Sequence, residues 1–374
     1  MNSVLIHDEA ELAPHLAGWD RLAVLRRQPY SAPAWMLAWW RNVAPPGARL
    51  AVVVARDGDE VVGVAPFYRV RTRTGLWTMR LLGTGHRVEP LAGAGRDAEV
   101  AESVVAALRG ASPRPGALRL DRADARSPWP TLLSYGWPGR SRVSRRRPVT
   151  APTLTIGGRS YDEWLATRSG NFRSQRKRTR RKLAERGAVA RLVGPDDDLE
   201  AAVEGFMRVH EARWSSRGES SSLGAGIGRM LLEAGRELVP SDRMRLWLLE
   251  ADGAPVSAQV FLVAGGEVAY WNGGFDPAWS DLRPAFETLG YAVEHAFGQG
   301  DLRVDFGGGS NPYKDRLADG DHPIGPAMVL PGGPDLPVRA AQLLPERLRR
   351  SAASAAKRLP DDLQERLRAL VRRH

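Results

Sequence analysis

Residues 243–275 read RMRLWLLEADGAPVSAQVFLVAGGEVAYWNGGF. In this stretch, Asp252-Gly253 and Gly265-Gly266 separate three apolar runs. Asp-Gly and Gly-Gly pairs between such runs are typical of two-residue hairpin turns, because the turn types that match twisted strands need positive φ angles. The stretch therefore predicts three consecutive antiparallel strands.

The segments on either side of these strands show helical spacing. An acidic cap, DDD, precedes the first helical segment, and a second helix is expected to begin near Pro284. The first carries Leu199, Val203, Phe206, Met207, His210 and Trp214, and the second carries Phe286, Leu289, Val293 and Phe297. GDLRVDFG at 300–307 then predicts another strand. This last helix and strand are expected to form a crossover that joins parallel strands.

The first half of the chain repeats this order of elements. It predicts helices at 12–22 and 31–43, a hairpin at 49–70 turned at Asp57-Gly58, a strand at 75–83, a helix at 97–109 and a strand at 116–121. The repeated order indicates an internal duplication. We therefore expect an α/β fold of the α+β kind, in which helices surround a mixed sheet twice. The lobes span 1–150 and 151–330, connected through the Pro-, Arg- and Ser-rich residues 123–152.

The composition limits the kinds of chemistry available. Of 374 residues, 54 are Lys or Arg and 43 are Asp or Glu, which gives a net charge of +11 and favours anionic partners. Cysteine is absent, which excludes thiol nucleophiles and disulfides and suits a reducing cytoplasm. No His, Asp and Glu cluster has metal-ligand spacing, so we expect no metal. We also expect a cytoplasmic protein, because neither a leader nor an apolar run of 18 residues is present.

The most basic stretch is GNFRSQRKRTRRKLAERG, residues 170–187. It predicts a helix with Asn171 as N-cap and Gly187 as the glycine beyond its end. Phe172, Thr179 and Leu183 share one narrow stripe, and the cations cover the rest of the circumference. Three interpretations stay open: a charged structural helix, a wall that binds an anionic ligand, and a nucleic-acid surface. The candidate anion-binding residues are Arg173, Arg176, Lys177 and Arg180.

The C-terminal residues 336–374 differ from both repeats. They contain LLPERLRRSAASAAKRL and LPDDLQERLRALVRRH, which predict basic amphipathic helices. A surface helix packed on the body is one interpretation. The other is a helix that binds a partner or an acidic membrane surface, which would place the protein at the inner face of the membrane.

Four ordered segments carry a family resemblance. They are SGNFRSQRKRTRRKLAERG, VHEARWSSRGESSSLG, LLEADGAPVSAQVFLVAGGEVAYWNGGFDP and GDLRVDFGGGSNPYKDRLADG. Together they resemble the acetyltransferase domain of the cellulose-biosynthesis and FemAB-like branch of the GNAT superfamily, over residues 151 to about 320. The resemblance implies two tandem GNAT-like lobes and transfer of an acyl group from acyl-CoA. In the FemAB relatives the donor is an aminoacyl-tRNA.

The resemblance also places the donor site. GNAT proteins bind CoA at the start of the helix that follows the fourth strand, and a helix N-terminus suits pyrophosphate. In this sequence the corresponding residues are Arg283, Ala285 and Phe286, next to Pro284. The Gly-rich turn usual in the family is missing from DPAWSDLRPAF. Pro284 can equally be read as a good first residue of a helix.

The candidate catalytic residues lie after the last predicted strand of the second half. Asp305 ends that strand, GGGS allows a ligand to approach the backbone closely, and Tyr313 and Lys314 follow. Asp305 could accept the acceptor's proton, Tyr313 could protonate the leaving thiolate, and Lys314 could hold negative charge. The structural alternative is that Asp305 caps a turn, Tyr313 packs and Lys314 is solvated.

Three functions therefore remain open at the level of sequence. The first is an N- or O-acetyltransferase that uses acyl-CoA and modifies an amine or hydroxyl of a sugar, a polysaccharide or a cell-envelope precursor. The second is an aminoacyl transferase that uses tRNA, and the third is a non-catalytic module that binds polyanions. The sequence does not identify the acceptor.

Overall fold

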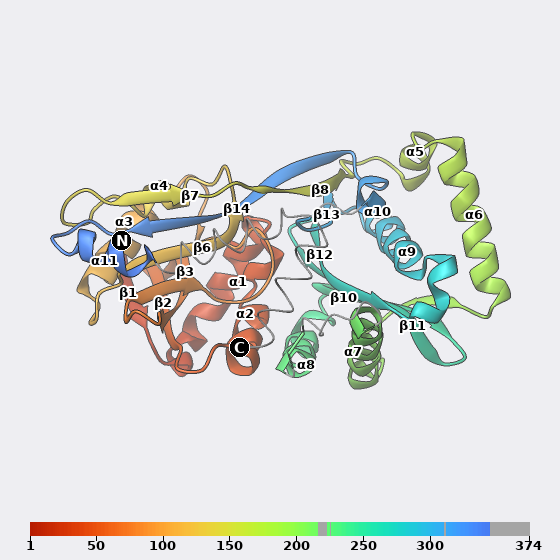
Figure 1. Cartoon of the computed structure of the whole chain (residues 1–374), viewed down its shortest axis with the longest axis horizontal. Coiled ribbons are helices and arrows are strands. Elements are labelled where there is room, and N and C mark those ends of the chain that lie inside the picture. Colours follow the sequence, from red (N-terminus) through yellow and green to blue (C-terminus); the bar gives the residue numbers. More distant parts are fainter. Residues whose placement is uncertain (216–222, 225, 310–311, 345–374) are drawn as a thin grey trace, which may run out of the picture.

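The computed structural model describes residues 1–215, 223–224, 226–309 and 312–344. Within this part of the chain, fourteen strands form one continuous sheet that runs through two lobes (Figure 1). The strand order is β1-β2-β3-β4-β6-β14-β8-β13-β12-β11-β10-β9, with β5 paired to β3 and β7 paired to β14. The predicted mixed sheet with surrounding helices is confirmed.

The two lobes repeat one order of elements. The first lobe contains β1 (Asn2–Ile6), η1 (Glu9–His15), α1 (Leu16–Leu25), η2 (Pro29–Ser31), α2 (Pro33–Val43), β2 (Arg49–Asp57), β3 (Glu60–Arg71), β4 (Trp77–Leu81), β5 (Leu91–Ala92), α3 (Asp97–Gly110) and β6 (Ala117–Asp124). The second contains α5 (Tyr161–Ala166), α6 (Gly170–Glu185), β9 (Val189–Leu192), α7 (Leu199–Ser215), α8 (Gly226–Leu238), β10 (Met244–Ala251), β11 (Ala254–Ala264), β12 (Glu267–Phe275), η3 (Pro277–Leu282), α9 (Pro284–Gly298), β13 (Arg303–Asp305) and α10 (Pro312–Asp315). In each lobe a strand, two helices and an antiparallel meander are followed by a crossover helix and a parallel strand.

The lobes exchange strands where the sequence predicts only a connection. Residues 123–152 contain α4 (Trp129–Leu132), β7 (Arg142–Arg145) and the start of β8 (Val149–Thr155). β8 follows the first lobe but pairs with β13 of the second lobe. β14 (Gly320–Leu330) leaves the second lobe and pairs with β6 of the first (Figure 1). The predicted boundary at residue 150 therefore falls inside β8.

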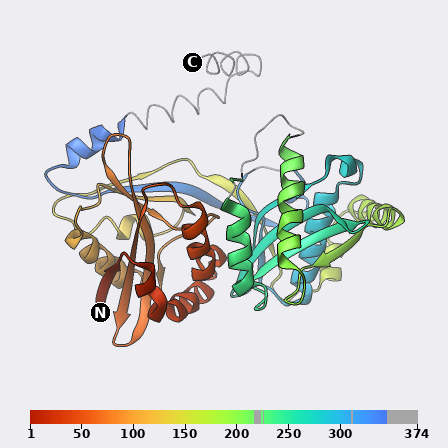
Figure 2. The same cartoon turned by 90° about the horizontal axis from the view of Figure 1, so that it is seen from below.

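Helices of both lobes cover the same face of the sheet. α1 and α2 of the first lobe and α7 and α8 of the second enclose a single apolar core that extends across both lobes. Figure 2 shows α2 and α8, in red and green, side by side where the lobes meet. Arg41 and Asn42 of α2 both bind Glu233 of α8, the amide at 2.7 Å. Because this core is shared, the residues between the lobes are held in fixed positions.

The opposite face of the sheet has separate cores. α3 packs on the first lobe, and α9 packs on the second with its predicted apolar face buried. The predicted turns of the second lobe are also confirmed, since Asp252, Gly253, Gly265 and Gly266 all have positive φ. α6 begins earlier than predicted, because the hydroxyl of Ser169, rather than Asn171, accepts the cap hydrogen bond from the Phe172 N–H.

The start of the basic C-terminal segment packs on the first lobe. α11 (Leu336–Gln342) is followed by Leu343, which is buried against Leu76, Ala117 and Leu330. The predicted helices beyond residue 344 lie outside the described residues. Among the residues described, none of the helices combines the length and the apolar character needed to span a membrane.

Candidate active site

Each lobe contains one pair of parallel strands that diverge after three residues. In the first lobe β4 pairs with β6 from Thr78 to Arg80. In the second lobe β12 pairs with β13 from Glu267 to Ala269, opposite Arg303 to Asp305. Beyond these pairs, the strand partners separate. Charged and aromatic side chains lie near this point in both lobes.

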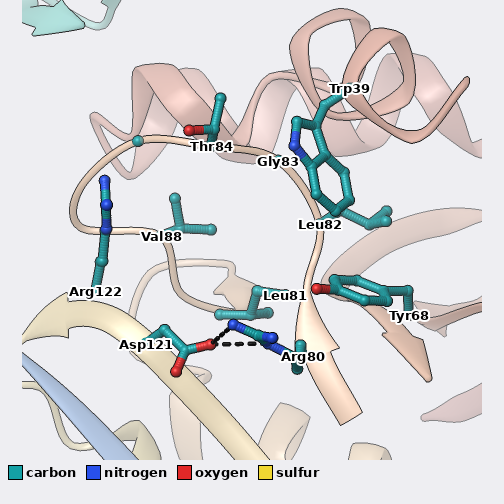
Figure 3. Close-up of a pocket in the computed structure, with 11 residues that line it drawn as sticks. Trp39, Tyr68, Arg80, Leu81, Leu82, Gly83, Thr84, Val88, Asp121 and Arg122 are labelled. Carbon is teal, nitrogen blue, oxygen red and sulfur yellow. Dashed lines mark hydrogen bonds and ion pairs between the residues drawn. The ribbon is translucent and has the colours of Figure 1, made fainter. Parts of the chain in front are cut away.

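In the first lobe the divergence holds a cavity of about 250 Å³ (Figure 3). Trp39 and Tyr68 form its aromatic side, and the residues 82–85 cross over it. Arg80 binds Asp121 on the opposite side, with Nε and Nη2 at 2.9 and 2.7 Å from Oδ2. The cavity therefore combines apolar rings with charged groups, as small-molecule sites commonly do.

In the second lobe β12 carries a β-bulge at the divergence. Phe261 pairs with Tyr270 and Val260 pairs with Asn272, so Trp271 is the extra residue. A bulge takes backbone groups out of the regular ladder and redirects them. Because the bulge follows directly after the last β12–β13 pair, these backbone groups lie at the edge of the divergence.

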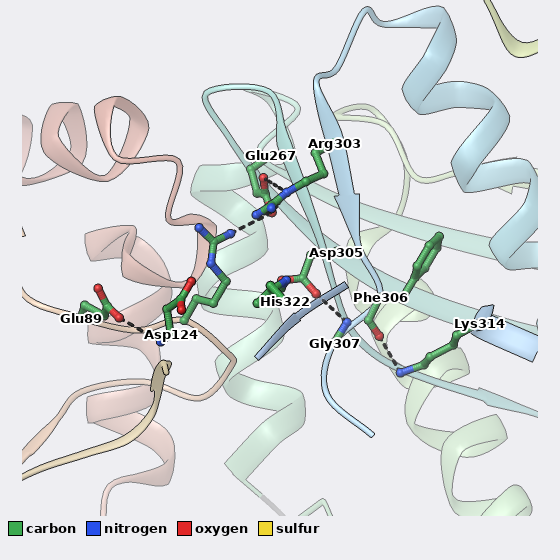
Figure 4. A network of polar contacts seen from close by, with 10 residues as sticks. Glu89, Asp124, Glu267, Arg303, Asp305, Phe306, Gly307, Lys314 and His322 are labelled. Atoms are coloured by element: carbon green, nitrogen blue, oxygen red, sulfur yellow. Dashed lines mark hydrogen bonds and ion pairs between the residues drawn. The ribbon is translucent and has the colours of Figure 1, made fainter. Parts of the chain in front are cut away.

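Asp305 is buried at this point, with 3% of its surface exposed (Figure 4). Its Oδ1 accepts a hydrogen bond of 2.8 Å from the Gly307 N–H, and Oδ2 lies 3.4 Å from His322 Nε2. Burial raises the pKa of Asp305 and lowers the pKa of His322 to about 4. His322 is therefore neutral at physiological pH, so the contact is not an ion pair. Asp305 caps the turn, as the structural alternative predicted, and also faces a titratable neighbour.

Lys314 is buried beside Asp305, with 6% of its surface exposed. Its ammonium donates a hydrogen bond of 2.5 Å to the Phe306 carbonyl and lies 5.0 Å from the centre of the Tyr270 ring. Burial lowers the pKa of Lys314 to about 8, although the nearby Asp305 opposes this shift. The structure thus excludes the alternative that Lys314 is solvated.

Tyr313 is half-buried and shares a side-chain hydrogen bond with Tyr270. Tyr270 is also hydrogen-bonded to Arg213, whose Nη1 donates to the Gly273 carbonyl at 3.2 Å. The three predicted catalytic residues, Asp305, Tyr313 and Lys314, therefore lie around the end of β13, with Tyr270 between them.

The first lobe adds residues that sequence reasoning missed. Tyr30 of η2 is 2% exposed, and its buried hydroxyl has no hydrogen-bond partner. Asp305 is close enough to raise the pKa of Tyr30, after the larger effect of burial. Both ring nitrogens of His322 likewise lack hydrogen-bond partners. Buried polar atoms without partners are costly, and they cluster here around the Asp305 carboxyl group.

Ion pairs and a buried carboxyl group lie next to this cluster, where the two lobes meet. Glu267, 3% exposed, binds Arg303 with Nε–Oε2 and Nη2–Oε1 distances of 2.9 and 2.8 Å. Arg87 of the first lobe reaches the same carboxylate at 3.0 Å. Nearby, Glu89 accepts the Asp124 N–H at 2.9 Å, and burial raises the pKa of Glu89 to about 7. The ion pair between Arg87 and Glu267 therefore joins the first lobe to β12.

The predicted donor-binding residues lie at the start of α9. Arg283 is exposed and adopts a left-handed conformation, with φ of 48°, at a helix N-terminus without a side-chain cap. The Ala285 carbonyl accepts a hydrogen bond from Gln259. Phe286 is buried edge-to-face against Phe172, so only its backbone could face a ligand. Arg283 is therefore the side chain here that is free to meet a phosphate group.

The four basic residues predicted on α6 divide into two pairs. Arg173 and Lys177 are exposed, whereas Arg176 is 4% exposed and Arg180 is half-buried. Arg176 donates to the Tyr161 hydroxyl at 2.8 Å and lies 3.5 Å from Glu287 of α9. Arg180 lies 3.7 Å from the same carboxylate oxygen and binds Glu294 at 2.8 Å. The cationic wall predicted around the helix is thus broken on the side that faces α9.

Metal ligation finds no support in the described part of the chain, where no group of three or more His, Cys, Asp and Glu could hold an ion. His210 is fully buried and accepts a hydrogen bond of 2.9 Å from Trp214, so it is a packed helix residue as the sequence suggested. Burial lowers the pKa of His210 to about 4.

Residues 170–315 match the protein family described as acetyltransferase (GNAT) domain. The matched residues span most of the second lobe, which is therefore similar to a GNAT acetyltransferase domain. The match includes α6, the β12 bulge, Asp305 and Lys314, and it ends at α10. No curated protein matches the sequence. The cellulose-biosynthesis branch expected from the resemblance is not confirmed.

Solved structures match the fold over both lobes. A crystal structure of FemX superposes with a TM-score of 0.58 at 12% identity, covering 86% of this chain and 97% of that chain. L-PGS from Bacillus licheniformis gives 0.55 at 12% identity, with 92% and 98% covered. The C-terminal domain of a putative lysylphosphatidylglycerol synthetase from Agrobacterium fabrum gives 0.55 at 10%, with 89% and 96% covered. At these identities the likeness concerns the fold alone.

Proposed function

We propose that this chain is an acyltransferase that moves an acyl group from acyl-CoA to an amine or hydroxyl of a polar acceptor. The observation that carries the proposal is the position of Lys314. It is a buried lysine of the GNAT domain, and it lies beside the bulged strand at the point where β12 and β13 separate. In this position a positive charge faces the place where the thioester carbonyl would gain negative charge.

The described residues supply each group that acyl transfer needs. The acceptor's nitrogen or oxygen forms a bond to the acyl carbon, and the bond from that carbon to the CoA sulfur breaks. Asp305 takes the acceptor's proton, with the neutral His322 next to it. Lys314 and backbone N–H groups at the Trp271 bulge stabilise the oxyanion. Tyr313 gives a proton to the leaving thiolate.

The donor is tested by thermal unfolding with acetyl-CoA. A ligand that binds only the folded protein stabilises it by ~2.7 kcal/mol at a concentration a hundred times its dissociation constant, so acetyl-CoA should raise the melting temperature. Arg283→Ala should reduce this shift because it removes the exposed cation at the α9 N-terminus. Arg236→Ala, on the exposed side of α8, serves as the control. Absence of any shift in the wild type would contradict the proposed donor.

Aminoacyl transfer from tRNA is a second candidate. It is favoured by the likeness to FemX and to the synthetase from Agrobacterium fabrum, whose name denotes an aminoacylated lipid as product. The exposed face of α6 supports it further, since Lys177, Arg178 and Lys182 all face solvent. A row of exposed cations suits the phosphate backbone of RNA without reading its sequence.

A charge-matched comparison tests this candidate. Changing Lys177, Arg178 and Lys182 together to Gln should weaken tRNA binding and flatten its salt dependence, because each lost phosphate contact lowers the slope by about one. The control changes Arg208, Arg229 and Arg236, which are exposed on α7 and α8, and removes the same charge. Equal effects of both triple variants would show a response to net charge and would rule out a site on α6.

The acceptor is proposed to be a sugar, a polysaccharide or another cell-envelope precursor. Aromatic faces and charged groups line the first-lobe cavity, and both are suited to a polar ring. The protein is proposed to act in the cytoplasm, with the basic residues 336–374 near the acidic inner face of the membrane.

A further inference from the structure

The strand of the first lobe that corresponds to β12 is interrupted. In the second lobe, Phe261 pairs with Tyr270, one extra residue follows, and pairing resumes at Val260 and Asn272. In the first lobe, Phe67 pairs with Leu81, and pairing resumes only where Val64 meets Leu91. Residues 82–90 therefore leave the sheet at the position where β12 has its one-residue bulge.

This excursion, which we call the 82–90 loop, reaches the second lobe. Its His86 ring packs on the turn after Asp305, so closely that a Cβ at Gly307 would lie 3.1 Å from His86 Nε2. The loop is held in place by Tyr30, because a Cβ at Gly85 would lie 2.3 Å from that ring. Gly85 also has a φ of 145°, which strongly favours glycine. The conformation of the loop therefore holds His86 in contact with the second lobe.

His86 lies among the groups already assigned to the reaction. Lys314 of α10, His322 of β14 and Arg122 of β6 are all near enough to affect its charge, and the Tyr30 ring meets it edge-on at 6.2 Å. Burial and these neighbours lower the pKa of His86 to about 3. The imidazole is therefore neutral at physiological pH and keeps one nitrogen able to accept a hydrogen bond.

The opposite side of the loop closes the first-lobe cavity. Gly83, Thr84 and Gly85 line that cavity, whereas His86 does not (Figure 3). The Thr84 carbonyl is fixed by the Trp35 indole N–H at 2.8 Å. One loop thus separates a cavity suited to a polar ring from the reacting groups of the second lobe.

We propose that His86 completes the active site of the second lobe, where its imidazole accepts a hydrogen bond from one N–H of an attacking amine while Asp305 takes the proton that the amine loses. This inference rests on the proposed acyltransferase function. The first lobe then helps to bind the acceptor and does not bind a second acyl donor. Its strand β4 is interrupted at the position where β12 continues through a bulge.

The absence of cysteine allows a direct test with one introduced thiol. The probe is bromoacetyl-CoA, whose reactive carbon occupies the place of the acyl group. In His86→Cys the thiol takes the place of the acceptor-binding group, so alkylation should be at least about tenfold faster than in Thr84→Cys, owing to proximity. An excess of CoA should abolish the difference. Peptide mass spectrometry locates the adduct and measures its rate.

The outcomes separate the inference from the function on which it rests. If acetyl-CoA stabilises the wild type but the two thiols react equally fast, His86 does not face the acyl group and the inference fails. If acetyl-CoA does not bind the wild type, the proposed function itself fails. If His86→Cys does not fold, the wild type provides the same test, because its own His86 can be alkylated by the probe. Its neutral His86 should be alkylated faster than the exposed His7, and CoA should protect it.

Discussion

Lys314→Ala is expected to lower turnover by about a hundredfold or more, with little change in the affinity for acetyl-CoA. The ammonium is buried beside Asp305 and faces the diverging ends of β12 and β13. A charge in this place interacts with the oxyanion of the transition state more strongly than with the neutral thioester. Initial rates of CoA release, measured with a small amine acceptor, give kcat and KM separately.

Arg236→Ala removes an exposed cation of α8 and provides the control. Its kcat should stay close to that of the wild type. The melting temperature of Lys314→Ala should be checked, because its ammonium also donates to the Phe306 carbonyl. Normal turnover in a folded Lys314→Ala variant, together with normal turnover in Asp305→Asn, would overturn the assignment of this site.

The pH dependence gives a second measure of the same residue. The pKa of Lys314 is lowered to about 8 by burial, so the ammonium is charged below that pH and loses its proton above it. If the charge stabilises the oxyanion, kcat should fall as the pH rises through about 8. A wild-type rate that stays level from pH 7 to pH 10 would contradict this role.

The sequence predicted the local elements well and the pairing between distant strands poorly. Asp252-Gly253 and Gly265-Gly266 specify their turns by positive φ, and the helix from Pro284 follows from its spacing. The exchange of β8 and β14 depends on pairing between residues far apart in the chain, for which periodicity gives no signal. The Arg- and Pro-rich composition of residues 123–152 also concealed the two strands there.

The same distinction applies to the candidate site. Asp305 and Lys314 could be found because a strand end, a glycine run and a lysine follow one another in the sequence. Tyr30 and His86 could not, because only the approach of the two lobes brings His86 to Gly307 and Tyr30 near Asp305. The sequence signal for this region was the pair of glycines, Gly83 and Gly85, at the end of the predicted strand 75–83.

The basic helix shows a different limit. A helical projection finds the buried side of α6 from Phe172 and Leu183, and it leaves most of the helix's charge to solvent or ligand. Arg176 is nevertheless buried, because its partner on α9 is Glu287 and the adjacent Gly290 leaves room for a guanidinium. A polar contact between two helices cannot be distinguished from an exposed face when only one helix is considered.

Glu287→Ala is expected to destabilise the folded protein by about 3–5 kcal/mol, the usual cost of leaving a buried charge without its partner. Glu287 is 2% exposed and lies between the guanidinium groups of Arg176 and Arg180. Its removal leaves Arg176 buried opposite an empty space. Urea unfolding of the two proteins, with equal m-values, gives the difference in free energy.

Glu294→Ala provides a control on the same helix. Glu294 pairs with Arg180 at 2.8 Å, but 42% of its side chain is exposed, so its loss should cost at most about 1 kcal/mol. Replacing both buried partners, by Glu287→Leu with Arg176→Met, should restore most of the stability, because apolar residues of similar volume carry no desolvation cost. If the double variant were as unstable as Glu287→Ala, the loss would come from packing between α6 and α9 and not from an unpaired charge.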